Sequence, residues 1–169
     1  MASAKTAPFY LTAAVTLSDT NYTQTTIPLG SYIDVASKQA IAILEVDYQA
    51  QNLTTHSSTL PSDRIVDYQV SDISQTGLLR GDDVNLISQG AMAYDNSPPN
   101  FSNESWLFPD SFGTLEEARM VVNDDLFFGA KTSSVSTAGN YAIVRIKCQV
   151  VKLSEKDFMA LALNTVASA

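Results

Sequence analysis

The sequence has few of the residues from which metal centres, disulfides and hydrolytic triads are built. It contains one cysteine, Cys148, and one histidine, His56. A single cysteine excludes a disulfide within the chain, and with one histidine it also excludes a structural zinc site. His56 lies in a Thr/Ser-rich stretch without any G-x-S-x-G motif nearby or elsewhere, so we interpret it as a solvated loop residue. We therefore expect no enzyme active site, no cofactor and no bound metal.

Basic residues are also scarce. Ten Lys and Arg stand against eighteen Asp and Glu, which gives a net charge of −8. Binding nucleic acid through its phosphates needs clustered Lys and Arg, whereas here they are scattered and residues 1–8 form no basic arm. We expect no direct nucleic-acid binding, and an anionic membrane surface is an equally poor partner.

Long apolar runs are absent as well. No stretch is long enough to span a bilayer, and the N-terminus has no charged-then-apolar signal. We therefore predict no membrane insertion and folding in a cytoplasm. Charged residues make up only 17% of the chain, against about 25% in typical proteins, and Ser, Thr, Asn and Gln take their place. Such a surface suits a chain that meets copies of itself, although a β-rich protein with many Thr and Ser residues explains it equally well.

Two long stretches with strand periodicity, residues 40–50 and 141–153, form the centre of the predicted fold. Side chains alternate between the two faces of a strand, and each stretch has one largely apolar face. The opposite face carries acids in the first stretch and bases in the second. Because opposite charges across a ladder favour pairing, we predict that the two strands are antiparallel neighbours. The residues expected to be largely buried are Leu44, Val46, Val144, Ile146 and Cys148.

Several shorter strands are expected around this pair. They lie at residues 9–17, 22–29, 65–70, 84–94 and 124–132. Pro28 confines its strand to an edge or a strand end, and Gly90 favours a bulge. Residues 76–83 are expected to form a short strand or turn, and residues 95–110 a loop.

Two helices complete the prediction. Residues 114–117, Thr-Leu-Glu-Glu, have the form of a capping box, which predicts one or two helical turns ending before Asn123. Ser154 is the predicted N-cap of a C-terminal helix, with Asp157 in its first turn. The apolar residues of this helix do not form one narrow stripe. Phe158, Leu161 and Val166 lean one way, and Met159 and Leu163 lean another.

Short strands separated by polar loops, with one or two short helices, are typical of an all-β protein. Distant strands that lie side by side are produced by Greek-key and jelly-roll connections. We therefore predict a single domain over residues 1–169, an antiparallel jelly-roll β-sandwich. An immunoglobulin-like sandwich is second in preference, because its usual buried Cys and Trp are missing.

Three groups of residues are candidate binding sites. The acidic pairs Asp82-Asp83 and Asp124-Asp125 are candidates for a Ca²⁺ site. Their spacing is not that of an EF-hand, and positions in turns or at strand ends explain them better. An ion bound at a contact between subunits remains an alternative. The aromatic residues Tyr94, Phe101 and Trp106 are candidates for a sugar-stacking platform, with packing or interface anchors as the alternative. The N-x-S/T sequons are interpreted as chance matches; they begin at Asn21, Asn52, Asn100 and Asn103.

The two long strands, the short strands between them and the compact size resemble single jelly-roll capsid proteins of small tailless icosahedral viruses, including those of archaea and bacteria. The resemblance covers roughly residues 40–153 and is architectural, without a short diagnostic motif. It implies a structural coat protein, many copies of which form an icosahedral shell in the virion. The missing basic arm departs from many such capsids and implies that another capsid protein or an internal layer contacts the genome.

Residues 1–17 and 154–169 are the expected assembly arms of such a shell. Two other functions remain open. The first is a carbohydrate-binding or adhesin-like β-sandwich, which predicts a monomer that binds glycans. The second is a hydrolase on the same scaffold, which predicts turnover that depends on particular acids.

Overall fold

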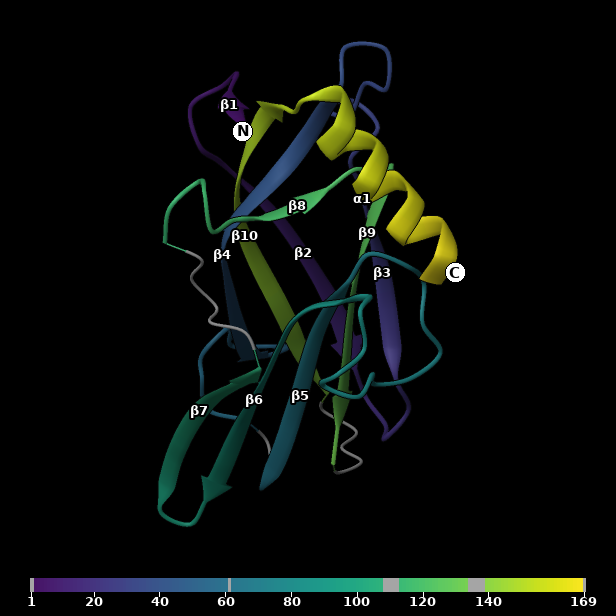
Figure 1. Ribbon diagram of the computed structural model, residues 1–169. Helices are drawn as coiled ribbons and strands as arrows, with labels where there is room; N and C mark the ends of the chain where they lie inside the picture. Colours follow the sequence, from purple (N-terminus) through teal and green to yellow (C-terminus); the bar gives the residue numbers. More distant parts are fainter. Residues whose placement is uncertain (1, 61, 108–112, 134–138, 169) are drawn as a thin grey trace.

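A computed structural model describes residues 2–60, 62–107, 113–133 and 139–168. In these residues the chain forms ten strands and one helix (Figure 1). The strands are β1 (Ser3–Ala4), β2 (Phe9–Leu17), β3 (Thr23–Pro28), β4 (Gln39–Asn52), β5 (Arg64–Ser71), β6 (Leu86–Asn96), β7 (Pro99–Leu107), β8 (Arg119–Val121), β9 (Asp125–Thr132) and β10 (Asn140–Lys152). The helix is α1 (Glu155–Ser168).

The strands form two antiparallel five-stranded sheets. In the first, which we call sheet A, β10 pairs with β1 and β2 on one side and with β4 on the other, and β8 follows β4. The second, sheet B, has the order β3-β9-β5-β6-β7. Apart from β1 and β7, the pairs are β2–β10, β3–β9, β4–β8 and β5–β6. The first of these strands pairs with the last, the second with the second-to-last, and so on inwards along the sequence. This is the topology of a long hairpin rolled around a core, and it confirms the predicted all-β jelly-roll sandwich.

The predicted pairing of the two long strands is correct. β4 and β10 are antiparallel neighbours at the centre of sheet A, with Asp47 opposite Arg145 and Glu45 opposite Lys147. The Lys147 ammonium lies 3.8 Å from the Glu45 carboxylate. The Arg145 guanidinium instead stacks on the ring of Tyr10, from the strand on the other side, at 4.0 Å from the ring centroid.

A β-bulge in β4 changes which of its residues face the core. Lys147 is opposite Glu45, but the next residue of β10, Cys148, is opposite Ile43, so Leu44 is the extra residue. An extra residue shifts the alternation of side chains by one. Ile43 is therefore fully buried in the main core, whereas Leu44 is only half-buried. The prediction that Leu44 is largely buried is wrong for this reason.

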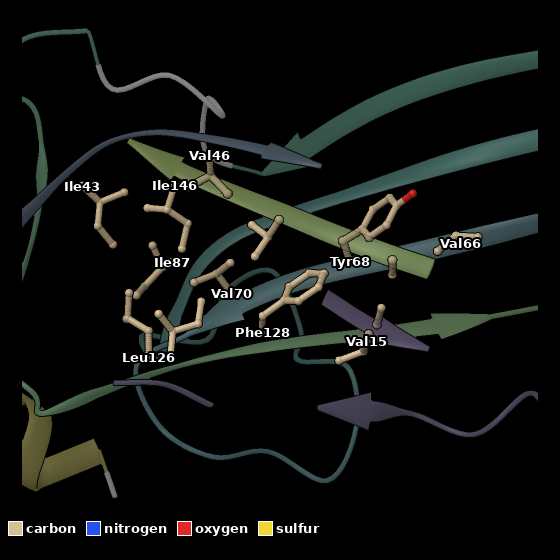
Figure 2. Packing of buried hydrophobic residues seen from close by; sticks show 14 of the residues in the cluster. Val15, Ile43, Val46, Val66, Tyr68, Val70, Ile87, Leu126, Phe128 and Ile146 are labelled. Carbon is tan, nitrogen blue, oxygen red and sulfur yellow. The ribbon is translucent and has the colours of Figure 1, made fainter. Parts of the chain in front are cut away.

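The main core lies between the two sheets, and Figure 2 shows side chains from both meeting there. Tyr68 and Phe128 of sheet B are among its largest members, and Tyr48 of sheet A stacks on Tyr68 with ring centroids 5.0 Å apart. The prediction of burial is confirmed for four residues: Val46, Val144, Ile146 and Cys148. Burial raises the pKa of the Cys148 thiol to about 12, so this thiol behaves as a small apolar group.

Most strand predictions agree with the structure, and the exceptions have local causes. Pro28 ends β3, an edge strand, and the β6–β7 register shifts around Gly90, both as expected. Residues 95–110 are not one loop, because Ser97 and Pro98 make a tight turn and β7 continues from Pro99. Proline is tolerated as the first residue of an edge strand.

Residues 76–83 contain a turn and no strand, which agrees with the second of the two expected alternatives. Their backbone is held by the Gln69 side chain of β5. Another short segment differs from the prediction. Residues 114–117 form a turn and no helix. β8 begins at Arg119 and pairs with β4, which leaves too few residues for a helix whose first turn is costly to form.

The C-terminal helix begins as predicted. The Asp157 backbone N–H donates to the Ser154 hydroxyl at 3.1 Å, which confirms Ser154 as the N-cap. Phe158 is buried in a second, smaller core on the other face of sheet A. The remaining buried members of this second core are Ala40, Ala42, Val151 and Leu153.

Candidate interaction surfaces

One side of α1 faces the second core and the other side faces away from it. Phe158 is buried and Leu161 is half-buried, while Met159 and Leu163 are 54% and 65% exposed. Lys156 is exposed as well. Residues three and four apart lie on the same face of a helix, so Lys156, Met159 and Leu163 form one line, which we call the outer stripe. The predicted division of apolar residues is confirmed for Phe158, Leu161, Met159 and Leu163, and the side chain of Val166 lies outside the described residues.

The beginning of α1 is fixed to the sandwich by polar contacts. Lys38 contacts the Glu155 carboxylate at 3.3 Å, and its backbone carbonyl accepts a hydrogen bond from the Leu153 N–H at 3.0 Å. A hydrogen bond from Ser154 lowers the pKa of the Asp157 carboxyl. A carboxylate in the first turn is favourable beside the positive end of the helix. The helix therefore leaves the sandwich in a defined direction.

The N-terminal segment lies along the edge of sheet A. Ser3 and Ala4 pair with the end of β10, and the Lys5 N–H donates to the Val150 carbonyl at 2.8 Å. β2 then pairs with the remainder of β10. Both segments expected to act as assembly arms, residues 1–17 and 154–169, are therefore connected to β10. The first contains β1 and β2, which pair with β10, and the second follows β10 in the sequence.

The outer face of sheet B is partly covered by residues 72–85, which connect β5 to β6. Gln69 points outward from β5 but is fully buried, because its side chain binds this loop. Its amide donates to the Gly77 carbonyl at 3.0 Å and its carbonyl oxygen accepts from the Leu79 N–H at 2.8 Å. Gln69 also donates to the Tyr22 hydroxyl at 2.8 Å. This part of the face is closed.

The other end of the same face is open and forms a hollow of about 370 Å³. Its floor is apolar, since Ile65 and Ala93 lie opposite each other in the ladder and Ile65 is 46% exposed. Asp63 and Asp95, both exposed, are the acidic residues of its lining. The full lining comprises Asp63, Arg64, Ile65, Ala93, Tyr94, Asp95, Asn100, Ser102 and Ser133.

Arg64 does not present its charge to the hollow. Its side chain is buried and reaches across to sheet A, where it donates to the Asn140 side-chain oxygen at 2.6 Å. It also donates to the Ser62 hydroxyl at 2.7 Å, and burial lowers its pKa. None of the ion pairs among the described residues includes Arg64. The exposed charge of the hollow therefore comes from Asp63 and Asp95 and is negative.

The candidate site residues His56, Asp82 and Asp125 lie in separate parts of the structure. His56 lies in an exposed turn with a φ of 56° and stacks on Tyr141 with centroids 6.0 Å apart. Asp82 contacts Arg80 at 2.9 Å on the surface, and Asp125 begins β9. Within the described ranges, no group of three or more His, Cys, Asp and Glu side chains is placed to hold a metal ion.

Of the three aromatic residues considered as a sugar-stacking platform, Tyr94 is buried in the main core and is not available for stacking. The side chains of Phe101 and Trp106 lie outside the described residues. Of the sequon residues, Asn100 is exposed at the hollow, and Asn52 accepts hydrogen bonds from the Thr54 and Thr55 N–H groups. None of the described helices has the length and apolarity needed to cross a membrane.

The sequence does not predict the hollow, because the residues that line it come from separate segments of the chain. Asp63 precedes β5, Ile65 lies at the start of β5, and Asp95 lies near the end of β6, in a segment that the sequence predicts as a loop. Lys156 was likewise not singled out. The only sequence signal for these residues is the alternation of Ile65 against Val66, which places an isoleucine on the outer face.

No protein-family model matches the sequence, and no curated protein matches it. Among solved structures, a chain from Desmodium yellow mottle tymovirus is similar with a TM-score of 0.35 and 8% identity, over 88% of this chain and 90% of that chain. A chain from infectious bursal disease virus, Gx strain, has a TM-score of 0.21 and 12% identity, over 89% of this chain and 38% of that chain. Both similarities are coarse, so the function is inferred from the residues of this chain.

Proposed function

We propose that the chain is a viral coat protein, copies of which associate into the shell of a virion after synthesis in the host cytoplasm. The observation that carries the proposal is the outer stripe of α1, two large apolar side chains left exposed on a helix that the sandwich holds in a fixed direction. The jelly-roll topology of the two antiparallel sheets is consistent with this role. The role is structural and needs no catalytic residue.

The expected energetics suit repeated weak contacts. Complete burial of a Met or Leu side chain contributes roughly 1.5–3 kcal/mol, which is modest for one contact. In a shell each copy makes several contacts, and their combined strength is far greater than that of one. The low charged fraction, 17%, keeps repulsion between copies small.

The arms have complementary roles in this proposal. The arm of residues 154–169 supplies the apolar contact through α1. The arm of residues 1–17 contains β1 and β2, which lie at the edge of sheet A, where a neighbouring copy can approach. Direct contact with the genome is not expected of this chain, because its net charge is −8. Other capsid proteins or an internal layer would provide that contact.

Self-assembly is tested by the size of the purified protein. Light scattering and electron microscopy are expected to show large closed particles for the full chain. Substitution of Met159→Ser together with Leu163→Ser is expected to abolish them while circular dichroism keeps its β signal. The matched control is Val35→Ser, which removes an equally exposed apolar side chain outside α1. A full chain that stays monomeric at every concentration would overturn the proposal.

Deletion of residues 156–169 is a second test of self-assembly. It removes the outer stripe, and the expected product is a folded β-domain that does not assemble. It also removes Phe158 from the second core, so a loss of β signal would show that the helix is needed for folding. The two point substitutions avoid this ambiguity because Phe158 stays in place.

A carbohydrate-binding or adhesin-like module is the second candidate. The observation in its favour is the hollow, where an apolar floor at Ile65 and Ala93 is surrounded by carboxylate, amide and hydroxyl groups. Such a mixture matches the apolar C–H faces and hydroxyl groups of a neutral sugar. A monomeric protein that binds neutral glycans, with binding lost in Ile65→Ser, would favour this function over assembly.

A further inference from the structure

Two of the exposed surfaces described above differ in shape: the outer stripe of α1 protrudes, and the hollow of sheet B is concave. We infer that the outer stripe of one copy packs into the hollow of the next copy. The inference rests on the self-assembly proposed above and adds which two surfaces join. The occupant of the hollow is thus a second copy of this chain.

The apolar groups of the two surfaces match. Met159 and Leu163 are exposed on the helix, and Ile65 is exposed on the floor of the hollow beside Ala93. Water contact with these side chains is unfavourable, and placing one set against the other removes both from water. The hollow, at about 370 Å³, is a depression suited to side chains and too small for a folded element.

The charges of the two surfaces also match. Lys156 lies one turn before Met159 on the outer stripe, and none of the ion pairs among the described residues includes it. Asp95 is exposed at the rim of the hollow, where one of its oxygens accepts from the Ser97 N–H at 2.9 Å. Opposite charges placed at the rim of an apolar contact fix its register and exclude the reversed orientation.

The contact must join different copies. In Figure 1 the helix lies at the upper right, and the β6–β7 turn, beside which the hollow lies, is at the lower left. A contact between two different surfaces is head-to-tail, and it closes into a ring when the rotation between copies allows. Rings of this kind are the units from which shells with rotational symmetry are built.

Cysteine crosslinking tests the contact directly, because the native Cys148 is fully buried and does not react. Copies with Leu163→Cys are mixed with copies with Ile65→Cys under mild oxidation, and dimers are counted on non-reducing gels. A disulfide forms only when the two Cα atoms come within about 7 Å. We expect about tenfold more crosslinked dimer than in the matched control mixture of Val35→Cys with Ile65→Cys, because the contact raises the effective thiol concentration.

The outcomes separate this inference from the proposed function. If the full chain forms particles but the Leu163→Cys and Ile65→Cys mixture gives no more dimer than the control, the pairing of surfaces is wrong and self-assembly stands. Preferential crosslinking of Leu163→Cys copies to one another overturns it too, since that result means a two-fold contact between helices. A monomeric full chain without crosslinks overturns both statements.

Charge reversal provides an independent test. Lys156→Glu and Asp95→Lys are each expected to weaken association several-fold, because each places like charges together. The two changes combined in one chain restore an opposite pair and are expected to restore particles. Asp95→Asn checks the turn, since an amide oxygen can still accept from the Ser97 N–H. A double variant no better than the single variants, with normal circular dichroism, would contradict the contact.

Discussion

The ring of Tyr22 lies so close over Gly129 that a Cβ atom on Gly129 would stand 1.8 Å from the Tyr22 hydroxyl oxygen. That hydroxyl is held from both sides, since it accepts from the Gln69 amide at 2.8 Å and donates to Gln24 at 3.2 Å. The absence of a side chain at position 129 therefore allows the Tyr22 hydroxyl to link Gln24 of β3 to Gln69 of β5, which in turn binds the loop that covers sheet B.

We expect Gly129→Ala to destabilise the protein by about 1–3 kcal/mol, because Tyr22 must leave its hydrogen bonds to avoid the new methyl group. Urea unfolding measures the change. Gly30→Ala is the matched control, since nothing lies within 4 Å of its added Cβ. The cost should shrink when Gly129→Ala is made in a Tyr22→Ala background; an equal cost in both backgrounds would mean that the contact with Tyr22 is not its cause.

The bulge in β4 predicts unequal effects at neighbouring positions. Ile43→Ala should cost about 2–5 kcal/mol, because it removes a fully buried side chain and leaves a cavity in the main core. Leu44→Ala should cost less, since Leu44 is half-buried as the extra residue. The unfolding midpoints of the two variants provide the measurement, and a larger loss for Leu44→Ala would place the bulge elsewhere.

Two buried tyrosines differ in the state of their hydroxyl groups. The Tyr68 hydroxyl is buried without a hydrogen-bond partner among the described residues, and the Tyr94 hydroxyl contacts the Asn96 side-chain oxygen at 3.2 Å. Tyr68→Phe removes an unsatisfied polar group and should raise the free energy of unfolding by about 1 kcal/mol. Tyr94→Phe should not raise it. Thermal unfolding of the pair decides this, and a destabilised Tyr68→Phe would mean that its hydroxyl has a partner.

Cys148 predicts a loss of stability at alkaline pH. The thiol pKa rises from 9.0 to about 12 on folding, so the unfolded chain releases its proton first as the pH increases. The contribution of Cys148 is complete below pH 9 and is lost as the pH rises from 9 towards 12, by up to about 1.4 kcal/mol per pH unit. Tyr68, whose pKa burial raises above 10, acts in the same direction.

Urea unfolding between pH 8 and pH 11 measures this dependence. Cys148→Ala should lower stability below pH 9 through lost packing. Above pH 9 its stability should decline less steeply than that of the full chain, because the variant has no thiol to deprotonate on unfolding. Parallel curves for the variant and the full chain would show that the thiol does not contribute to the pH dependence.

The sequence predicted those features of the fold that depend on a single strand or on one facing pair. Alternation of apolar residues identified β4 and β10, and their opposite charges identified them as neighbours, as the pairing of Glu45 with Lys147 confirms. The cap of α1 was visible because Ser154 and Asp157 act through local hydrogen bonds.

Features that arise only where separate segments meet in the folded chain could not be predicted from patterns within single segments. Alternation gives no sign that Leu44 is an extra residue, because the bulge is defined only against β10. Gln69 looks like an exposed residue of β5, and its burial results from a loop that returns over it. The hollow has the same origin, because Ile65 and Asp95 come from different strands and meet only in the assembled sheet.

The pairing of the first long strand with the last has a consequence for folding during synthesis. β10 is the central strand of sheet A, since β2 and β4 both pair with it. Until residues 140–152 have left the ribosome, β2 and β4 have no partner between them, and their apolar faces have no complete sheet to join. Such non-local pairing makes folding slow and exposes strand edges for longer. A nascent chain therefore cannot form sheet A, or the second core beneath α1, before β10 has been made.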